Sequence, residues 1–270
     1  MRSFMYLFII FLTFGVLTGL LSSLFGFGGG FVVVPMLYIV LPTLGFPDTL
    51  VMYVAIGTSL AIMIVNSTNS TISHHRKKHI LWFIFLQLAP TIAVGAIIGG
   101  LVSPLIEGDI LRYLFITLVV YTIFSSLITK SFIHIKTDSI QMPSRLKTSL
   151  AGGIIGFIST LLGVGGGLMT IPFLRTCHLK MVNAVSLATP LSLPIAIFGT
   201  ITAIFNGFNH PDLPPWSLGF VYIPAFLGIV FGGFIGVPIG IWISHILPDR
   251  LFSRIYLLLL SIVVMTMIFE

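Results

Sequence analysis

Long apolar segments alternate with short polar connections along the whole chain. In the first half the apolar segments cover residues 4–24, 31–41, 50–71, 80–102 and 110–129. In the second half they cover residues 149–162, 168–174, 184–205, 218–243 and 251–269. A helix needs about 20 apolar residues to cross the hydrocarbon core of a bilayer. The longer segments therefore predict transmembrane helices, whereas segments 31–41 and 168–174 are too short to cross.

The two short segments follow a glycine motif that occurs twice. Gly26 to Gly30, followed by Pro35, matches Gly163 to Gly167, followed by Pro172. The offset is constant at 137 residues (163 − 26 = 137 and 172 − 35 = 137). Repeated glycines inside an apolar run mark positions where the backbone bends or closely approaches another group. We interpret the chain as one half-protein used twice, with residues 15–35 belonging to the mature fold.

The short segments also predict the local geometry of each motif. A helix over residues 168–175 would be about 12 Å long, whereas the hydrocarbon core is about 30 Å thick. Each glycine motif is therefore expected to be the tip of a re-entrant or broken helical hairpin. The expected fold is an all-α polytopic membrane protein of eight to ten membrane segments. Its two inverted repeats, residues 1–130 and 148–270, each hold one hairpin and three transmembrane helices, and residues 131–147 form a cytoplasmic linker.

Composition agrees with a membrane class and orients the chain. The residues are 57% hydrophobic and 7% charged, and the mean hydropathy is +1.14, whereas soluble domains carry about 25% charged residues. The proposed topology places residues 74–79, 130–147, 175–183 and 244–254 on one side, and these hold 11 of the 13 Lys and Arg. This bias predicts a cytoplasmic side and extracytoplasmic termini. It explains the net charge of +6 without a nucleic-acid partner.

Several kinds of chemistry are not expected. Cys177 is the single cysteine, and neither a His-Glu-x-x-His nor a Gly-x-Ser-x-Gly motif occurs. We therefore expect no enzyme activity, no metal site and no cofactor. All carboxylates lie in connections or at the end of the chain, which argues against a buried proton relay. Asn66 and Asn69 begin glycosylation-like triplets, but both lie at the end of a membrane segment and are discounted.

The hairpin tips are the candidate binding site for a small anion. A helix N-terminus offers free N–H donors and the positive end of the helix dipole, and glycines leave those donors uncovered. Nearby hydroxyls would add further donors. The simpler alternative is that the glycines only permit close helix packing. The candidate substrate-binding residues are Ser22, Ser23, Gly26, Gly28, Gly29, Gly30, Thr58, Ser59, Ser159, Thr160, Gly163, Gly165, Gly166, Gly167 and Thr189.

These motifs resemble those of a known family. The duplicated Gly-x-Gly-Gly-Gly-x₄-Pro, the Gly-Thr-Ser at residues 57–59, the basic loop with His74 and Arg76, and the Gly-x-Pro-x-Gly at residues 236–240 are similar to the TauE/SafE sulfite-exporter family. The resemblance covers essentially the whole chain. It implies transport of small sulfur-containing or organic anions, such as sulfite, thiosulfate or organosulfonates, across the bacterial inner membrane.

Alternatives remain open at this level. The chain is expected to be a permease or exporter that works by alternating access, with an anion held at the two hairpin tips. An anion channel on the same scaffold, or a non-transporting membrane subunit, would have the same composition. The sequence names neither the anion nor the direction of transport, and it leaves a homo-oligomer possible.

Overall fold

The computed structural model describes residues 2–76, 80–128, 144–208 and 210–268. In the first half the helices are α1 (Arg2–Phe25), α2 (Gly30–Thr43), α3 (Asp48–Arg76), α4 (Trp82–Val102), the 3₁₀ helix η1 (Ser103–Leu105) and α5 (Gly108–Ile128). In the second half they are α7 (Arg145–Leu161), α8 (Gly167–Thr176), α9 (Met181–Gly207), α10 (Ile223–Ile246) and α11 (Asp249–Ile268). Most of the expected linker, residues 131–143, lies outside the described residues.

The all-α polytopic membrane fold is confirmed. Within the described residues, seven helices are long and apolar enough to cross a membrane. Helices α2 and α8, with 14 and 10 residues, are about 21 Å and 15 Å long. Both are too short to cross the hydrocarbon core, as their segments predicted.

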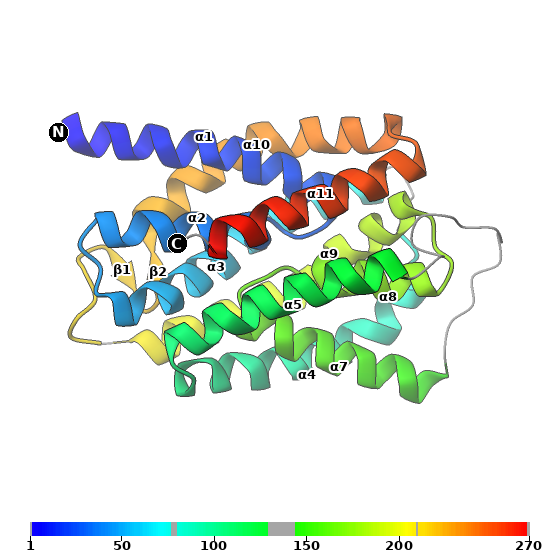
Figure 1. The fold of residues 1–270 in the computed structure, drawn as a ribbon, viewed down its shortest axis with the longest axis horizontal. Coiled ribbons are helices and arrows are strands. Elements are labelled where there is room, and N and C mark those ends of the chain that lie inside the picture. The colour runs from blue at the N-terminus through cyan, green and yellow to red at the C-terminus, as the bar shows by residue number, and fades with distance from the viewer. Residues whose placement is uncertain (1, 77–79, 129–143, 209, 269–270) are drawn as a thin grey trace.

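The helices run roughly along one direction, and their ends gather at two opposite ends of the bundle (Figure 1). Both chain termini lie toward the end that holds the short hairpin of β1 and β2. The C-terminal end of α5 and the N-terminal end of α7 lie at the opposite end (Figure 1). Helices α1 and α7 end inside the bundle, and α2 and α8 lead back from there. The expected topology and its placement in a bilayer stay predictions.

Helix pairs in the two halves correspond to one another. Helix α1 packs along α10, and α7 packs along α4. Helix α2 packs on α3 and α11, whereas α8 packs on α9 and α5. Each pair becomes its counterpart when the two halves are exchanged, which is the pattern expected of duplicated halves. The inverted orientation of the repeats stays a prediction.

Glycines outside the tips serve close packing. The Gly19 position of α1 faces the backbone of Gly233 in α10, and the Gly95 position of α4 faces the backbone of Gly153 in α7. Small residues let the backbones of membrane helices approach closely. The packing alternative raised for the glycine motifs therefore applies to these helix pairs.

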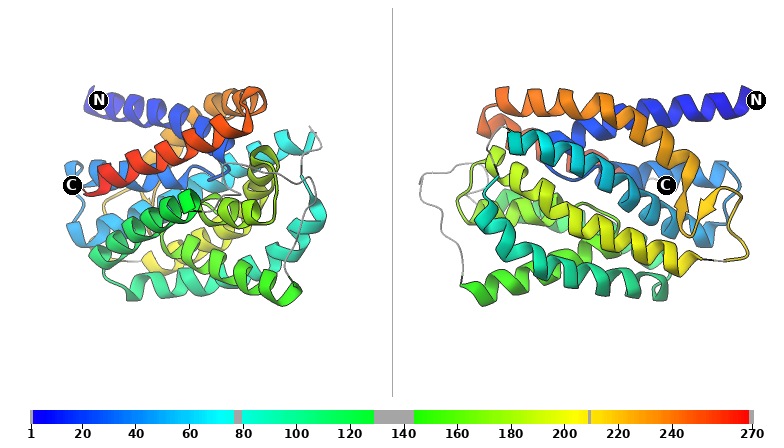
Figure 2. Two further views of the ribbon diagram at one scale, coloured as in Figure 1. Left: turned by 45° about the vertical axis from the view of Figure 1, so that its right-hand side comes forward. Right: turned by 180° about the vertical axis from the view of Figure 1, so that it is seen from behind.

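Two expected boundaries are wrong. Helix α3 continues past residue 71 to Arg76 and so includes the start of the basic loop. The expected segment 218–243 does not begin as a helix, because β1 (Ser217–Leu218) and β2 (Val221–Tyr222) pair antiparallel before α10 starts (Figure 2). Gly219 in the turn has a φ of +55°, a conformation that glycine adopts without steric cost.

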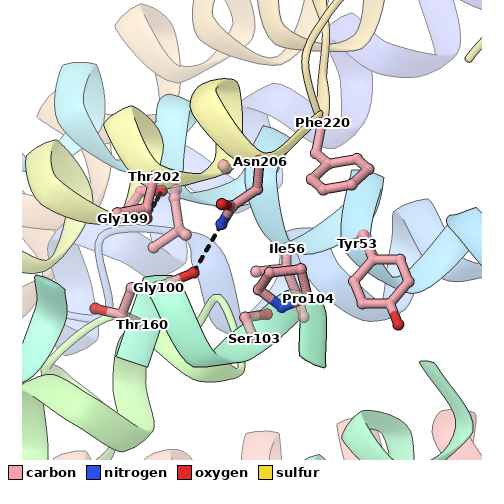
Figure 3. Close-up of a pocket in the computed structure, with 12 residues that line it drawn as sticks. Tyr53, Ile56, Gly100, Ser103, Pro104, Thr160, Gly199, Thr202, Asn206 and Phe220 are labelled. Atoms are coloured by element: carbon pink, nitrogen blue, oxygen red, sulfur yellow. Dashed lines mark hydrogen bonds between the residues drawn. The ribbon is translucent and has the colours of Figure 1, made fainter. Parts of the chain in front are cut away.

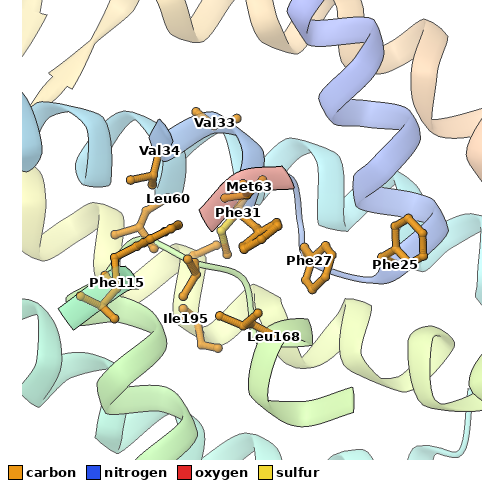
Figure 4. Packing of buried hydrophobic residues seen from close by; sticks show 14 of the residues in the cluster. Phe25, Phe27, Phe31, Val33, Val34, Leu60, Met63, Phe115, Leu168 and Ile195 are labelled. Atoms are coloured by element: carbon orange, nitrogen blue, oxygen red, sulfur yellow. The ribbon is translucent and has the colours of Figure 1, made fainter. Parts of the chain in front are cut away.

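Aromatic rings hold the first tip in place. Phe27 lies 5.9 Å from Phe25 and 5.0 Å from Phe31 between ring centroids. Phe31 stacks on Phe115 of α5 at 6.1 Å (Figure 4). Tyr256 of α11 stacks on Phe27 at 5.4 Å. Such pairs contribute about 0.5–1.5 kcal/mol each beyond the area they bury. The tip therefore rests on side chains from both halves.

Candidate functional site

The two glycine tips touch each other through their backbones. A Cβ atom added at Gly165 would overlap the carbonyl group of Phe27, and one added at Gly167 would meet the carbonyl oxygen of Gly26. On the other side, a Cβ at Gly30 would meet the carbonyl oxygen of Gly163. The space at Gly165 is therefore smaller than a methyl group. Glycine is needed here because two segments of the chain cross with their backbones in direct contact.

The tips share one backbone feature and differ in others. Gly26 and Gly163, at matching positions, have φ of +68° and +65°. Gly28 and Gly29 also have positive φ, at +68° and +97°, whereas Gly166 has a φ of −51°. The first tip is thus the more irregular of the two. Duplicated sequences have not produced identical tips.

Two serines tie the tips to the long central helices. Ser59 of α3 donates to the carbonyl oxygen of Gly163 at 2.8 Å. Ser192 of α9 lies 3.4 Å from the carbonyl oxygen of Gly26 and accepts from the N–H of Gly166 at 3.1 Å. Each half therefore supports the tip of the other. Ser192 was not among the expected site residues, because its contact with the first tip comes from the other half of the chain.

Both tips end in uncapped helix N-termini. Helix α2 begins after Gly29 and α8 after Gly166, and neither N-cap glycine has a side chain to cap its helix, although Ser192 accepts from the N–H of Gly166. Gly30 and Gly167, the first residues of these helices, are buried. The hydroxyls of Ser22 and Ser159, which match at the repeat offset, are buried without a hydrogen-bond partner within the described residues. Buried helix N-termini and unsatisfied hydroxyls are costly unless something else binds them.

A route leads from one end of the bundle toward the second tip. A vestibule of about 720 Å³ narrows to a cavity of about 20 Å³, and the two share Tyr53, Pro104, Asn206 and Phe220. The cavity reaches Thr160 beside Gly199 (Figure 3). Its volume is enough for about one water molecule. Phe220 stacks on Tyr53 at 5.5 Å, so the β1–β2 hairpin narrows the route.

Comparison with known proteins decides the family. The family model described as sulfite exporter TauE/SafE matches residues 11–267. The chain belongs to this family. No solved structure matches the chain.

Relatives of this TauE/SafE member carry names of the same kind. A probable membrane transporter protein of Haemophilus influenzae is 33% identical over 94% of this chain and 95% of its own length. One from Methanocaldococcus jannaschii is 31% identical over 85% of both chains. The chain is thus a membrane transporter of the TauE/SafE type, as its motifs suggested.

Some of the sequence-predicted residues of this TauE/SafE chain hold neighbouring elements. Thr58 accepts a hydrogen bond from the N–H of Tyr222 in β2 at 2.9 Å. Ser23 donates to the carbonyl oxygen of Val237 in α10 at 2.9 Å. Thr189 donates to Val185 within its own helix at 2.9 Å, although it also lies beside Gly26. Their hydroxyls have protein partners here, and a role in binding substrate stays a prediction.

Beyond the tips, away from the vestibule, α3 of this TauE/SafE chain carries a buried polar face. Asn66, Ser67, Ser70 and His74 lie at helical spacing and are all buried. His74 Nδ1 lies 3.1 Å from Ser186 Oγ of α9. This contact joins α3 and α9 near the C-terminal end of α3. The sequence offered a signal in the polar run of residues 66–71, but the run was discounted with its glycosylation-like triplets.

Proposed function

We propose that this TauE/SafE member carries a small anion across the bacterial inner membrane by alternating access. Sulfite, thiosulfate and organosulfonates are the proposed class of substrate. The observation that carries this proposal is the meeting of two uncapped helix N-termini inside the bundle. Oriented N–H groups and the positive end of the helix dipole favour an anion at such a place.

The surroundings of the tips support an anion over a cation. The hydroxyls of Ser22, Ser159 and Thr160 are buried and without partners within the described part of the chain. Every Asp and Glu lies outside the apolar segments. Donors without a nearby carboxylate suit an oxyanion, whereas buried ionic sites for a cation typically include a carboxylate.

A narrow cavity on one side of the tips and a contact between the central helices on the other favour a carrier over a channel. The cavity on the vestibule side has room for about one water molecule, which is less than a sulfur oxyanion needs. On the other side, the contact between His74 and Ser186 holds α3 against α9. An anion at the tips would therefore leave toward either side only after a conformational change, which is the behaviour of a carrier.

Charge supports outward movement. Asp48, Glu107, Asp109 and Asp212 line the vestibule, at the end that the topology places outside. They would repel a returning anion from its mouth. An inside-negative potential adds about 2.3 kcal/mol per charge per 100 mV in favour of anion exit. Export therefore needs no coupling ion.

We expect the flux of anion in proteoliposomes to follow membrane potential. Thiosulfate, which stays ionised across the pH range used, would be loaded inside, and potassium–valinomycin would set the potential. An inside-negative potential should accelerate efflux severalfold over protein-free vesicles, and a pH gradient at zero potential should not drive accumulation. Uphill accumulation driven by the pH gradient alone would contradict uncoupled transport.

A further inference from the structure

Around the first tip, polar side chains from two helices converge on the start of α2. Asn66 and Ser67 of α3 and Ser22 of α1 are at most 1% exposed. The Nδ2 atom of Asn66 lies 3.2 Å from the place where a Cβ of Gly29 would be. Ser67 Oγ lies 2.7 Å from the corresponding place at Gly28. These groups therefore face the residues immediately before the first turn of α2.

The donors in this group have no partner in the described structure. Asn66 Nδ2, Ser67 Oγ and Ser22 Oγ each lack a hydrogen bond. Asn66 fits against α10 because Gly233 has no side chain at the point of contact. A buried polar atom without a partner is costly, so unpaired donors gathered at one helix start indicate a place for a ligand.

The second tip differs from the first. The N–H of Gly166 already donates to Ser192. Ser59 and Ser192, each of which supports the tip of the other half, are 133 residues apart. The same spacing places Gly199 in the second half where the first half has Asn66. The second tip keeps unpartnered hydroxyls on Ser159, Thr160 and Thr170, but its matching position supplies no side-chain amide. The two halves of the site are therefore chemically unequal.

We propose that the first tip holds the charged oxygen atoms of the substrate and that Asn66 is the residue that determines its specificity. This inference rests on the proposed function and deepens it. Three donors, Asn66 Nδ2, Ser67 Oγ and Ser22 Oγ, surround an oxyanion placed at the N-terminus of α2. Neutral donors and a helix dipole bind the anion without a cationic side chain that would hold it too tightly for release.

Asn66→Asp is the sharpest test. It keeps the size of the side chain but replaces the donor with a carboxylate that repels an anion. Binding of radiolabelled thiosulfate, sulfite and ethanesulfonate to the full-length protein in detergent should weaken by about a hundredfold or more. Asn66→Ala should weaken binding by about tenfold, and Asn66→Ser, which keeps a small donor, should lie between wild type and alanine.

Asn69→Asp is the matched control. It makes the same chemical change on the same helix, at a half-buried position next to Ser70. It should bind the same anions within about twofold of wild type, a margin well below one lost hydrogen bond to a charged group. Gel filtration would show that each variant is folded, and Asn66→Ser gives a readout if the aspartate variant is not. Wild-type binding that Asn66→Asp leaves intact would overturn this inference alone. A wild-type chain that binds and transports no anion in the panel would overturn the proposed function and this inference with it.

Discussion

Replacing Gly165 with alanine is expected to destabilise the fold strongly, whereas alanine at the neighbouring Gly166 should be tolerated. A Cβ at Gly165 overlaps the backbone carbonyl of Phe27, which cannot turn aside as a side chain can. At Gly166 the nearest atom to a Cβ is Ile195 Cδ1 at 3.1 Å, the mobile end of a side chain, and φ is −51°. Overpacking a tight interior costs about 1–3 kcal/mol and sometimes more, and backbone overlap belongs at the upper end.

Thermal unfolding in detergent would measure this difference. The apparent Tm of Gly165→Ala should fall by about 10 °C or more, with a reduced monodisperse peak, since 3 kcal/mol corresponds to about that shift in a chain of this size. Gly166→Ala should unfold within a few degrees of wild type. Equal stability of the two variants would show that the tips do not meet as described.

A covalent bridge between α3 and α9 is expected to stop transport completely. His74 Nδ1 and Ser186 Oγ are 3.1 Å apart and buried where the polar face of α3 ends. In alternating access this end must open for the anion to enter from the cytoplasm. Replacing His74 and Ser186 with cysteines and bridging them with mercury(II) or an oxidant should therefore reduce flux to that of protein-free vesicles.

The bridging experiment needs a background without Cys177. That thiol is buried, and burial raises its pKa, so it should react slowly. Cys177→Ala removes its reaction with mercury(II) or the oxidant. Reductant should restore flux in the double variant. Neither the bridging reagent nor the reductant should change flux in a variant with only one of the two cysteines. Full flux in a quantitatively bridged protein would contradict an opening between these two helices.

The sequence predicted the fold more fully than the site. Repeated glycines and arms too short to cross indicated two hairpins, because both signals are local. The boundary at α10 was wrong because a hairpin of two two-residue strands overlaps the start of an apolar run, where hydropathy alone does not separate strand from helix. The contact between Phe27 and Gly165 joins residues far apart in the chain, and no local pattern reports such a contact.

The same reasoning explains which polar residues were missed. Ser192 lies in the second half but supports the tip of the first half, so its role depends on how the two halves pack. Asn66 and Ser67 are polar residues in a glycosylation-like triplet, and their helical face becomes meaningful only when α3 is seen to pack against the first tip. Side chains whose partners come from another helix depend on tertiary packing, which the one-dimensional pattern does not contain.

Counterflow in proteoliposomes tests the proposed carrier most directly. Vesicles preloaded with unlabelled thiosulfate, sulfite or ethanesulfonate would be diluted into a trace of labelled anion at zero membrane potential. A carrier should show transient uptake of label that saturates with external concentration and is absent without internal anion. Uptake that rises linearly with concentration would indicate a channel, and no exchange for any anion in the panel would contradict anion transport by this chain.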